Sequence, residues 1–223
     1  MQRIAIIGGT GKEGKGIAYR WAKAGHEVTI GSRAIEKAQI AADEINELLP
    51  STAPQVVGMV NVQAADWGDV VAITVPYQAH AEMLNQLKEV ITGKLVIDVT
   101  VPLVPPKVHI AQMPPAGSAG NEARSILGEE TPVAIAFQNI SYERLMEEGD
   151  IDCDVLVCGS SKQAREQVLG LVKDAGLIGW DAGPLENAMV IEGLTSVLIH
   201  INKTYGSKEA GIKITGVQKD RNL

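Results

Sequence analysis

The 223-residue chain has little of several residue types that would point to particular functions. Aromatic residues make up only 4% of it, with a single phenylalanine, which argues against an aromatic platform for stacking single-stranded bases. Basic residues are outnumbered: 20 Lys and Arg stand against 27 Asp and Glu, and the net charge is −7. Because nucleic-acid binders carry basic surfaces, we expect no nucleic-acid partner.

Cysteine and long apolar segments are also scarce. The two cysteines, Cys153 and Cys158, cannot build a disulfide framework and indicate a reducing, cytoplasmic setting. The four His and two Cys show no zinc-ligand spacing, so we expect no metal. The apolar run at the N-terminus is too short for a signal peptide, and longer ones are broken by Gly, Pro or charge, so we expect no membrane span.

What the chain does contain is an alternation of short apolar runs with helical patterns. Strands are predicted at residues 3–7, 27–30, 55–60, 70–75, 94–99, 132–137 and 154–158. Helices are predicted at residues 16–24, 34–49, 78–91, 162–175 and 185–205, and a rigid proline-rich loop at 102–120. Apolar runs without alternation are typical of strands buried on both faces. We therefore predict an α/β fold, a doubly wound Rossmann-type parallel sheet with a small C-terminal helical appendage.

The first turn carries a dinucleotide-binding motif. Gly9, Gly11 and Gly14 fit G-x-G-x-x-G between a predicted strand and a predicted helix. In this motif the first glycine permits a tight turn, the second lets a pyrophosphate approach the backbone, and the third lets the helix pack on the strand. The anion is expected on the free N–H groups of the helix N-terminus.

The end of the second predicted strand indicates which dinucleotide binds. An NAD site usually has Asp or Glu there, whereas this strand ends in Ser32-Arg33, with Lys37 one turn further on. A hydroxyl and a guanidinium fork suit a 2′-phosphate. We predict NADP rather than NAD, with residues 1–180 as the NADP-binding domain and residues 181–223 as the C-terminal appendage.

Other predicted strand ends should meet at the same edge of the sheet and form a flat slot for the nicotinamide. None of them brings a well-placed titratable pair, and His80 and His109 are interpreted as structural. Reducing a carbonyl needs a proton donor, but hydride exchange with a second redox cofactor needs two rings in register. We therefore predict no catalytic acid–base residue. The residues expected at the slot are Val75, Pro76, Tyr77, Val101, Asn139 and Ile140.

Over nearly its whole length the chain resembles the NADPH-dependent reductases of coenzyme F420, an 8-hydroxy-5-deazaflavin. The resemblance is carried by IGGTGKEGKG (7–16), IGSR (30–33) with Lys37, ITVP (73–76), DVTVP (98–102), AFQNIS (136–141), DAGPLEN (181–187) and AGIKI (210–214). The chain departs from the family pattern at Gln138, where His or Asn is expected, and at Tyr142, where a small residue is expected. The same domain resembles the cytoplasmic part of membrane ferric reductases.

The resemblance implies direct hydride transfer between NADP(H) and F420 in a homodimer whose C-terminal parts contribute to the interface. It implies that NADP is held by Thr10, Gly11, Lys12, Glu13, Ser32, Arg33 and Lys37, and that Val75, Pro76 and Tyr77 flank the nicotinamide. It assigns the deazaflavin side to Val101, Asn139, Ile140, Ala210 and Gly211, so that the appendage completes the slot.

Two other classes of function remain open at this point. An NADPH-dependent imine, ketone or flavin reductase would use the same nucleotide site, and the imine or ketone enzyme would need an acid, for which Tyr77 or His80 are the candidates. A non-catalytic NADP-binding sensor would fill the slot with side chains and use the proline-rich loop as a partner surface.

Overall fold

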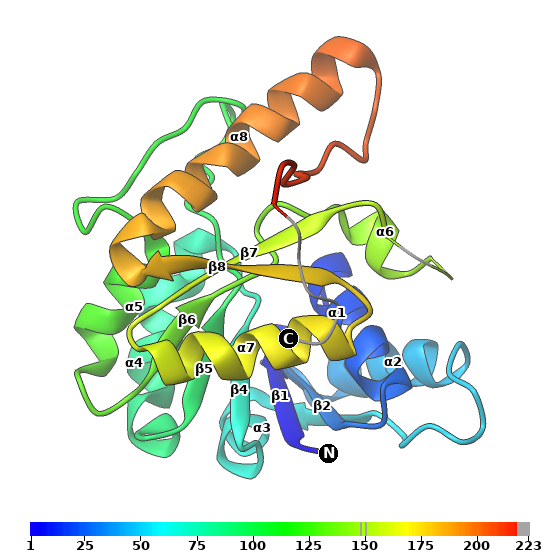
Figure 1. The fold of residues 1–223 in the computed structure, drawn as a ribbon. Helices are drawn as coiled ribbons and strands as arrows, with labels where there is room; N and C mark the ends of the chain where they lie inside the picture. The colour runs from blue at the N-terminus through cyan, green and yellow to red at the C-terminus, as the bar shows by residue number, and fades with distance from the viewer. Residues whose placement is uncertain (148, 150, 218–223) are drawn as a thin grey trace.

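The computed structural model describes residues 1–147, 149 and 151–217. Its centre is an eight-stranded sheet with the order β3-β2-β1-β4-β5-β6-β7-β8 (Figure 1). The strands are β1 (Arg3–Ile7), β2 (Glu27–Ser32), β3 (Val57–Val60), β4 (Val70–Ile73), β5 (Leu95–Asp98), β6 (Val133–Ile135), β7 (Asp154–Gly159) and β8 (Ile178–Pro184). The first six are parallel, and β7 and β8 run antiparallel to them. The predicted doubly wound α/β fold is confirmed, with a reversed pair of strands at one edge.

Helices cover both faces of this sheet. One face carries α1 (Lys12–Lys23), α2 (Ile35–Asn46) and α7 (Lys162–Asp174), and the other carries α3 (Asn61–Trp67), α4 (Tyr77–Ile91) and α5 (Ala119–Leu127). The short α6 (Tyr142–Leu145) lies against α1, and α8 (Ala188–Tyr205), preceded by a 3-10 turn (Leu185–Asn187), extends from the edge of the sheet. Among the described residues no helix is long and apolar enough to cross a membrane.

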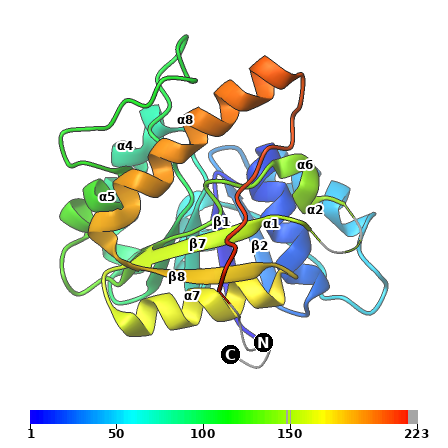
Figure 2. The same ribbon diagram turned by 45° about the horizontal axis from the view of Figure 1, so that its top comes forward.

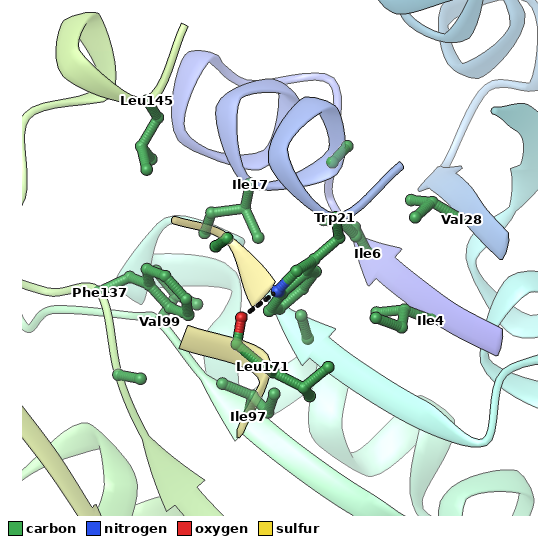
Figure 3. Packing of buried hydrophobic residues seen from close by; sticks show 14 of the residues in the cluster. Ile4, Ile6, Ile17, Trp21, Val28, Ile97, Val99, Phe137, Leu145 and Leu171 are labelled. Atoms are coloured by element: carbon green, nitrogen blue, oxygen red, sulfur yellow. Dashed lines mark hydrogen bonds between the residues drawn. The ribbon is translucent and has the colours of Figure 1, made fainter. Parts of the chain in front are cut away.

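Each strand feeds two cores because its side chains alternate between the faces of the sheet. In β1, Ile4 and Ile6 pack with α1 and α7, whereas Ala5 and Ile7 pack with α3 and α4. In the first core, the Trp21 indole N–H donates to the Leu171 carbonyl at 2.9 Å (Figure 3). This bond satisfies the polar atom of a fully buried ring, as a close-packed core requires.

The direction of winding reverses between β1 and β4, which are neighbours in the sheet. The strands on one side of this point lead to β3, and those on the other side lead to β8. In doubly wound folds ligands bind in the crevice beyond the carboxyl ends of the strands at such a reversal. The glycine motif between β1 and α1 therefore stands at the expected binding edge.

The C-terminal part contains a strand that the sequence analysis missed. β8 has no continuous apolar run, since Gly179, Asp181 and Gly183 interrupt it, and pairing with β7 defines it instead. The proposed domain boundary at residue 180 falls inside β8, and residues 218–223 of the proposed appendage lie outside the described residues. After α8 the chain returns along β7, where the Asp154 N–H donates to the Ile212 carbonyl at 2.7 Å (Figure 2).

Candidate functional site

The glycine loop after β1 is packed too tightly for side chains at two of its positions. A Cβ at Gly9 would lie 2.8 Å from the Ile6 carbonyl, and one at Gly14 would lie 2.6 Å from the Gly9 Cα. A Cβ at Gly11 would meet nothing within 4 Å, so this position faces open space. Gly11 is also the N-cap of α1 and offers no side chain to its first turn. The first N–H groups of α1 are thus left for an external anion.

The carboxyl end of β2 carries a second set of polar groups beside this loop. Ser32 is buried, and its Oγ accepts the Ala34 N–H at 3.3 Å, which leaves the hydroxyl hydrogen available for an acceptor. Arg33 and Lys37 are exposed, and among the described residues neither forms an ion pair. Two uncommitted cations and a hydroxyl can hold a phosphate.

A cavity of about 630 Å³ opens beyond the carboxyl ends of β4, β5 and β6. Of the residues predicted for the site, eight line it: Glu13, Val75, Pro76, Tyr77, Val101, Asn139, Ile140 and Ala210. The glycine loop touches its wall, because a Cβ at Gly8 would lie 2.5 Å from Val75 Cγ1. The other predicted residues lie outside the lining: Gly9, Thr10, Gly11, Lys12, Gly14, Ser32, Arg33, Lys37 and Gly211.

A strained bend follows β6 and shapes one side of the cavity. Phe137 has φ 73°, the one positive φ among the described non-glycine residues, and its ring packs edge-on against Trp21 with centroids 5.7 Å apart (Figure 3). A bulky residue in this conformation costs of the order of 1–3 kcal/mol and is held by its surroundings. The bend brings the three residues after it, Gln138, Asn139 and Ile140, to the cavity.

Helix α8 also contributes to the wall of the cavity and is hydrogen-bonded to this bend. The Asn139 side-chain amide donates to the Ile191 carbonyl at 2.9 Å and to Thr195 Oγ1 at 3.1 Å, and Thr195 Oγ1 donates to the Gln138 carbonyl at 2.9 Å. Further along α8, Asn202 Oδ1 accepts the Ala210 N–H at 3.0 Å, so the returning chain is held against the cavity. The C-terminal segment is thus part of the cavity wall.

Lys12 links the glycine loop to the far side of the cavity. Its Nζ lies 2.9 Å from the Tyr142 hydroxyl and 4.5 Å from the centroid of that ring. The hydrogen bond to Tyr142 raises the pKa of Lys12. Tyr142, the bulky departure from the family pattern, therefore contacts Lys12 beside the glycine loop and also lines the cavity.

Glu13 brings a carboxyl group to the cavity from the first turn of α1. Its Oε1 is buried without a hydrogen-bond partner among the described residues, and burial raises the pKa of Glu13 to about 8. The side chain is mostly neutral at pH 7. A neutral carboxyl group avoids repelling an anion on the adjacent helix N-terminus.

A buried titratable cluster, which the sequence analysis missed, lies behind Tyr77. The His80 ring is completely buried; its Nε2 lies 2.7 Å from Asp98 Oδ2, and its Nδ1 lies 2.9 Å from Glu122 Oε1. The Tyr77 hydroxyl donates to Glu122 Oε2 at 3.0 Å. Three separate segments supply these groups, and the available signal was an aspartate at the end of an otherwise apolar strand, β5.

The cluster perturbs its own protonation. Burial lowers the pKa of His80, but the charge of Asp98 and hydrogen bonds to Asp98 and Glu122 outweigh this and raise it to about 9. Burial and the hydrogen bond to Glu122 raise the pKa of Tyr77 to about 12. Burial also raises the pKa of Glu192, on α8, to about 8, although its carboxylate accepts the N–H groups of Ala119 and Gly120.

Known proteins resemble this chain over most of its length. Residues 3–102 match the family model described as "NADP oxidoreductase coenzyme F420-dependent". The F420-dependent NADP reductase of Methanocaldococcus jannaschii is 38% identical, with 97% of this chain and 99% of the relative covered. That of Methanothermobacter marburgensis is 40% identical, with 96% and 99% covered. Mouse metalloreductase STEAP2 is 26% identical over 86% of this chain and 35% of its own length.

Solved structures share the fold. A provisional F420-dependent NADP-reductase from Arthrobacter sp. FB24 superposes with a TM-score of 0.79 at 26% identity, covering 96% of this chain and 100% of that one. The pyrroline carboxylate reductase of Plasmodium falciparum, solved with NADP bound, gives 0.58 at 14% identity, with 92% of this chain and 66% of that chain covered. At that identity the second likeness concerns the fold alone.

Proposed function

Because the chain belongs to the family of F420-dependent NADP reductases, we propose that it transfers a hydride directly between NADP(H) and coenzyme F420. The observation that carries the proposal is identity of 38–40% to three reductases of this name along essentially the whole chain, cavity-lining segments included. A match confined to the glycine loop would have supported nucleotide binding alone.

The residues at the edge of the sheet fit the NADP half of this reaction. The N–H groups of the first turn of α1 would hold the pyrophosphate, with Thr10, Gly11, Lys12 and Glu13 around it. Ser32, Arg33 and Lys37 would hold the 2′-phosphate, since they offer a hydroxyl and two exposed cations, without ion pairs to any described residue, at the end of β2 and the start of α2. The open space over Gly11 is what close approach of a phosphate requires.

The cavity would hold the two reacting rings. Val75, Pro76 and Tyr77 would flank the nicotinamide, and Val101, Asn139, Ile140 and the backbone near Ala210 and Gly211 would form the deazaflavin side. Bound NADPH would supply the hydride, and the proton that completes the reduced deazaflavin would come from solvent. These largely apolar walls would exclude water and hold the two ring planes in contact, and orientation of this kind can lower a barrier by about 7–11 kcal/mol.

The two acids that the sequence analysis named for imine or ketone reduction, Tyr77 and His80, have their polar atoms bonded to neighbouring carboxylates, whereas the mostly neutral Glu13 carboxyl group on the lining belongs to the turn proposed for the pyrophosphate. The Tyr77 hydroxyl donates to Glu122, and His80 is fully buried with both ring nitrogens occupied. A reductase of imines or ketones would need one of them to reach its substrate. Their arrangement therefore supports direct hydride transfer without a dedicated general acid.

The test is the absorbance band of oxidised F420 after NADPH is added to the purified protein, with NADH, FMN and FAD in parallel. We expect loss of the band with NADPH, little with NADH, and slower or no reaction with either flavin. Reduction of flavins but not of F420 would replace the proposal with a flavin reductase. Tight NADPH binding without reduction of any acceptor would indicate a sensor.

We also propose a homodimer formed partly by α8, in the cytoplasm. The support is a row of exposed apolar side chains on this helix, including Val190 at 63% exposure and Val197 at 48%, more than one helix usually presents to water. Both cysteines are free and buried, which fits a reducing compartment. Sedimentation at micromolar concentration should give a dimer, and Val190→Glu should shift it toward monomer; a monomeric wild type would contradict the proposal.

A further inference from the structure

The buried cluster behind Tyr77 joins the elements that surround the cavity. His80 belongs to α4, Asp98 ends β5, and Glu122 lies on α5. The second oxygen of each carboxylate is also used: Asp98 Oδ1 accepts the Thr100 N–H at 3.0 Å, and Glu122 Oε2 accepts the Tyr77 hydroxyl. Both of these donors belong to residues that line the cavity, whereas His80 does not line it.

The bonding of His80 defines its charge state. An imidazole ring with one proton can donate from one nitrogen only, but here each nitrogen faces a carboxylate oxygen at 2.7–2.9 Å. A doubly protonated ring donates to both, and these charge-assisted bonds are the strong kind in a buried setting. The titratable groups around the ring are Asp98 from β5, Glu122 from α5 and Glu192 from α8, all carboxyl groups, besides the Tyr77 hydroxyl.

Tyr77 connects the His80 cluster to the cavity, because it contacts Glu122 and also lines the cavity. Its ring stacks on that of His80 with centroids 6.0 Å apart and 28° between the planes. Its hydroxyl donates to Glu122, which does not line the cavity, while Tyr77 itself does. The ring is therefore fixed both by stacking and by its hydroxyl.

We propose that His80 is a positioning residue: as an imidazolium between Asp98 and Glu122 it fixes the Tyr77 ring and the Thr100 backbone against which the reacting rings are aligned. The hydride-transfer readout rests on the proposed function; the protonation state of His80 does not. Loss of the His80 bonds to Asp98 and Glu122 should leave the groups of the glycine loop and β2, which are proposed to bind phosphate, in place. The loss should therefore fall on the transfer rate and not on NADPH affinity.

The first experiment needs no activity. Histidine side-chain ¹H–¹⁵N correlation spectra of the full-length protein, with His80 assigned by its disappearance in His80→Gln or by the perturbation that Tyr77→Phe causes, should show both ring nitrogens protonated at pH 7.5. In Glu122→Gln the Nδ1 proton should shift. A neutral tautomer for His80 at pH 7.5 would overturn the proposal, whether or not the protein reduces F420.

The second experiment measures single-turnover F420 reduction and NADPH affinity for Tyr77→Phe and His80→Gln. Tyr77→Phe keeps the ring and removes only the hydrogen bond from its hydroxyl to Glu122. It therefore tests the proposal even if His80→Gln fails to fold. We expect transfer to slow about tenfold in His80→Gln and about threefold in Tyr77→Phe, with the NADPH Kd within twofold of wild type. Wild-type transfer rates in both variants, or a loss confined to NADPH affinity, would overturn the proposal.

His26→Gln is the matched control. His26 is also a buried histidine with a carboxylate partner, Asp174 Oδ2 at 3.0 Å, but it lies at the amino-terminal end of the sheet beside Gln2, away from the cavity. Its replacement should lower stability and leave the transfer rate unchanged. If the transfer rate fell equally in His26→Gln and His80→Gln, the loss would come from a general decrease in stability, and the positioning role of His80 would be wrong.

Discussion

The proposed phosphate region (Gly9–Gly14, Ser32, Arg33 and Lys37) and the cavity region, which comprises the residues that line the cavity, lie at the same edge of the sheet but are built differently. The phosphate region uses backbone N–H groups and exposed cations from two short stretches of chain. The cavity region uses side chains from six elements or their connections, and its polar groups are bonded to one another beneath the surface. The proposed phosphate region presents N–H groups and cations that a ligand can bind. In the cavity region the polar groups bond to one another and stabilise the shape of the cavity.

This difference predicts how each region responds to change. Exposed cations act separately, so removing one should weaken binding by a limited and additive amount. A buried network acts as a unit, because the loss of one member leaves its partners unpaired in a medium of low dielectric constant. Substitutions in the phosphate region should therefore alter affinity, and those in the cavity region should alter rate and stability.

The largest effect is expected from crowding the cavity. Val101→Trp places an indole on the lining, and because a displacement of about 1 Å between reacting groups can cost about 10²-fold, F420 reduction should fall at least that far. NADPH binding, measured by fluorescence, should persist. Val104→Trp is the control, because Val104 is 40% exposed on the same segment and does not line the cavity; similar losses in both variants would show that the segment, not the cavity, matters.

The pH dependence of stability should expose the buried cluster. The folded-state pKa of His80, about 9, exceeds its ordinary 6.5, so its contribution is complete below pH 6.5 and is lost as pH rises through 9. This shift corresponds to about 3 kcal/mol in the free energy of unfolding. Glu192 acts in the same direction, since its pKa of about 8 lies above its ordinary 4.5 and the loss begins above that pH.

Urea denaturation at pH 6.5 and pH 9 measures this fall. His80→Gln should reduce the fall and leave the part that Glu192 and Glu13 cause, whereas His26→Gln should keep the whole of it. Stability that rises between these two pH values in the wild type would contradict the assigned charge state.

A smaller effect is expected in the phosphate region. Arg33→Ala should raise the KM for NADPH by one to two decades, because it removes a charge-assisted contact worth about 1.5–3 kcal/mol, and should leave the KM for NADH nearly unchanged. Arg3→Ala is a charge-matched control, since Arg3 pairs with Asp69 at the amino-terminal end of the sheet. Equal use of both nucleotides by the wild type would remove the basis of this prediction.

The smallest effect is expected where the two regions touch. Tyr142→Phe removes the hydroxyl that contacts Lys12 but keeps the ring beneath the ammonium group. An exposed contact of this kind is worth about 1 kcal/mol or less, so the NADPH Kd should change by less than about fivefold. A change beyond tenfold would mean that the two regions are coupled through this pair.

The sequence alone determined the doubly wound fold, and it predicted the proposed phosphate region. Apolar runs mark strands that are buried on both faces, and the glycine spacing and the Ser32-Arg33 strand end are contiguous, so their geometry follows from short-range sterics and hydrogen bonding. β8 was missed because pairing with β7 defines it more than any apolar pattern does. α5 was missed although its sequence carries a helical signal, since Ser118 caps it and Ala119, Ala123 and Leu127 are buried along one side. The reversed direction of β7 was missed because a strand's apolar run is the same in either direction.

Only the tertiary structure decided what stands behind the cavity. His80, Asp98 and Glu122 are separated by 18 and 24 residues along the chain, and each taken alone is an ordinary helical or strand-end residue. Their proposed role depends on the distances of 2.7–2.9 Å between the His80 ring nitrogens and the two carboxylates, which arise when β5, α4 and α5 pack together. Burial by itself lowers the pKa of His80, and the two carboxylates that the fold brings to the ring outweigh this and raise it, which is why only the tertiary structure decides the proposed charge state.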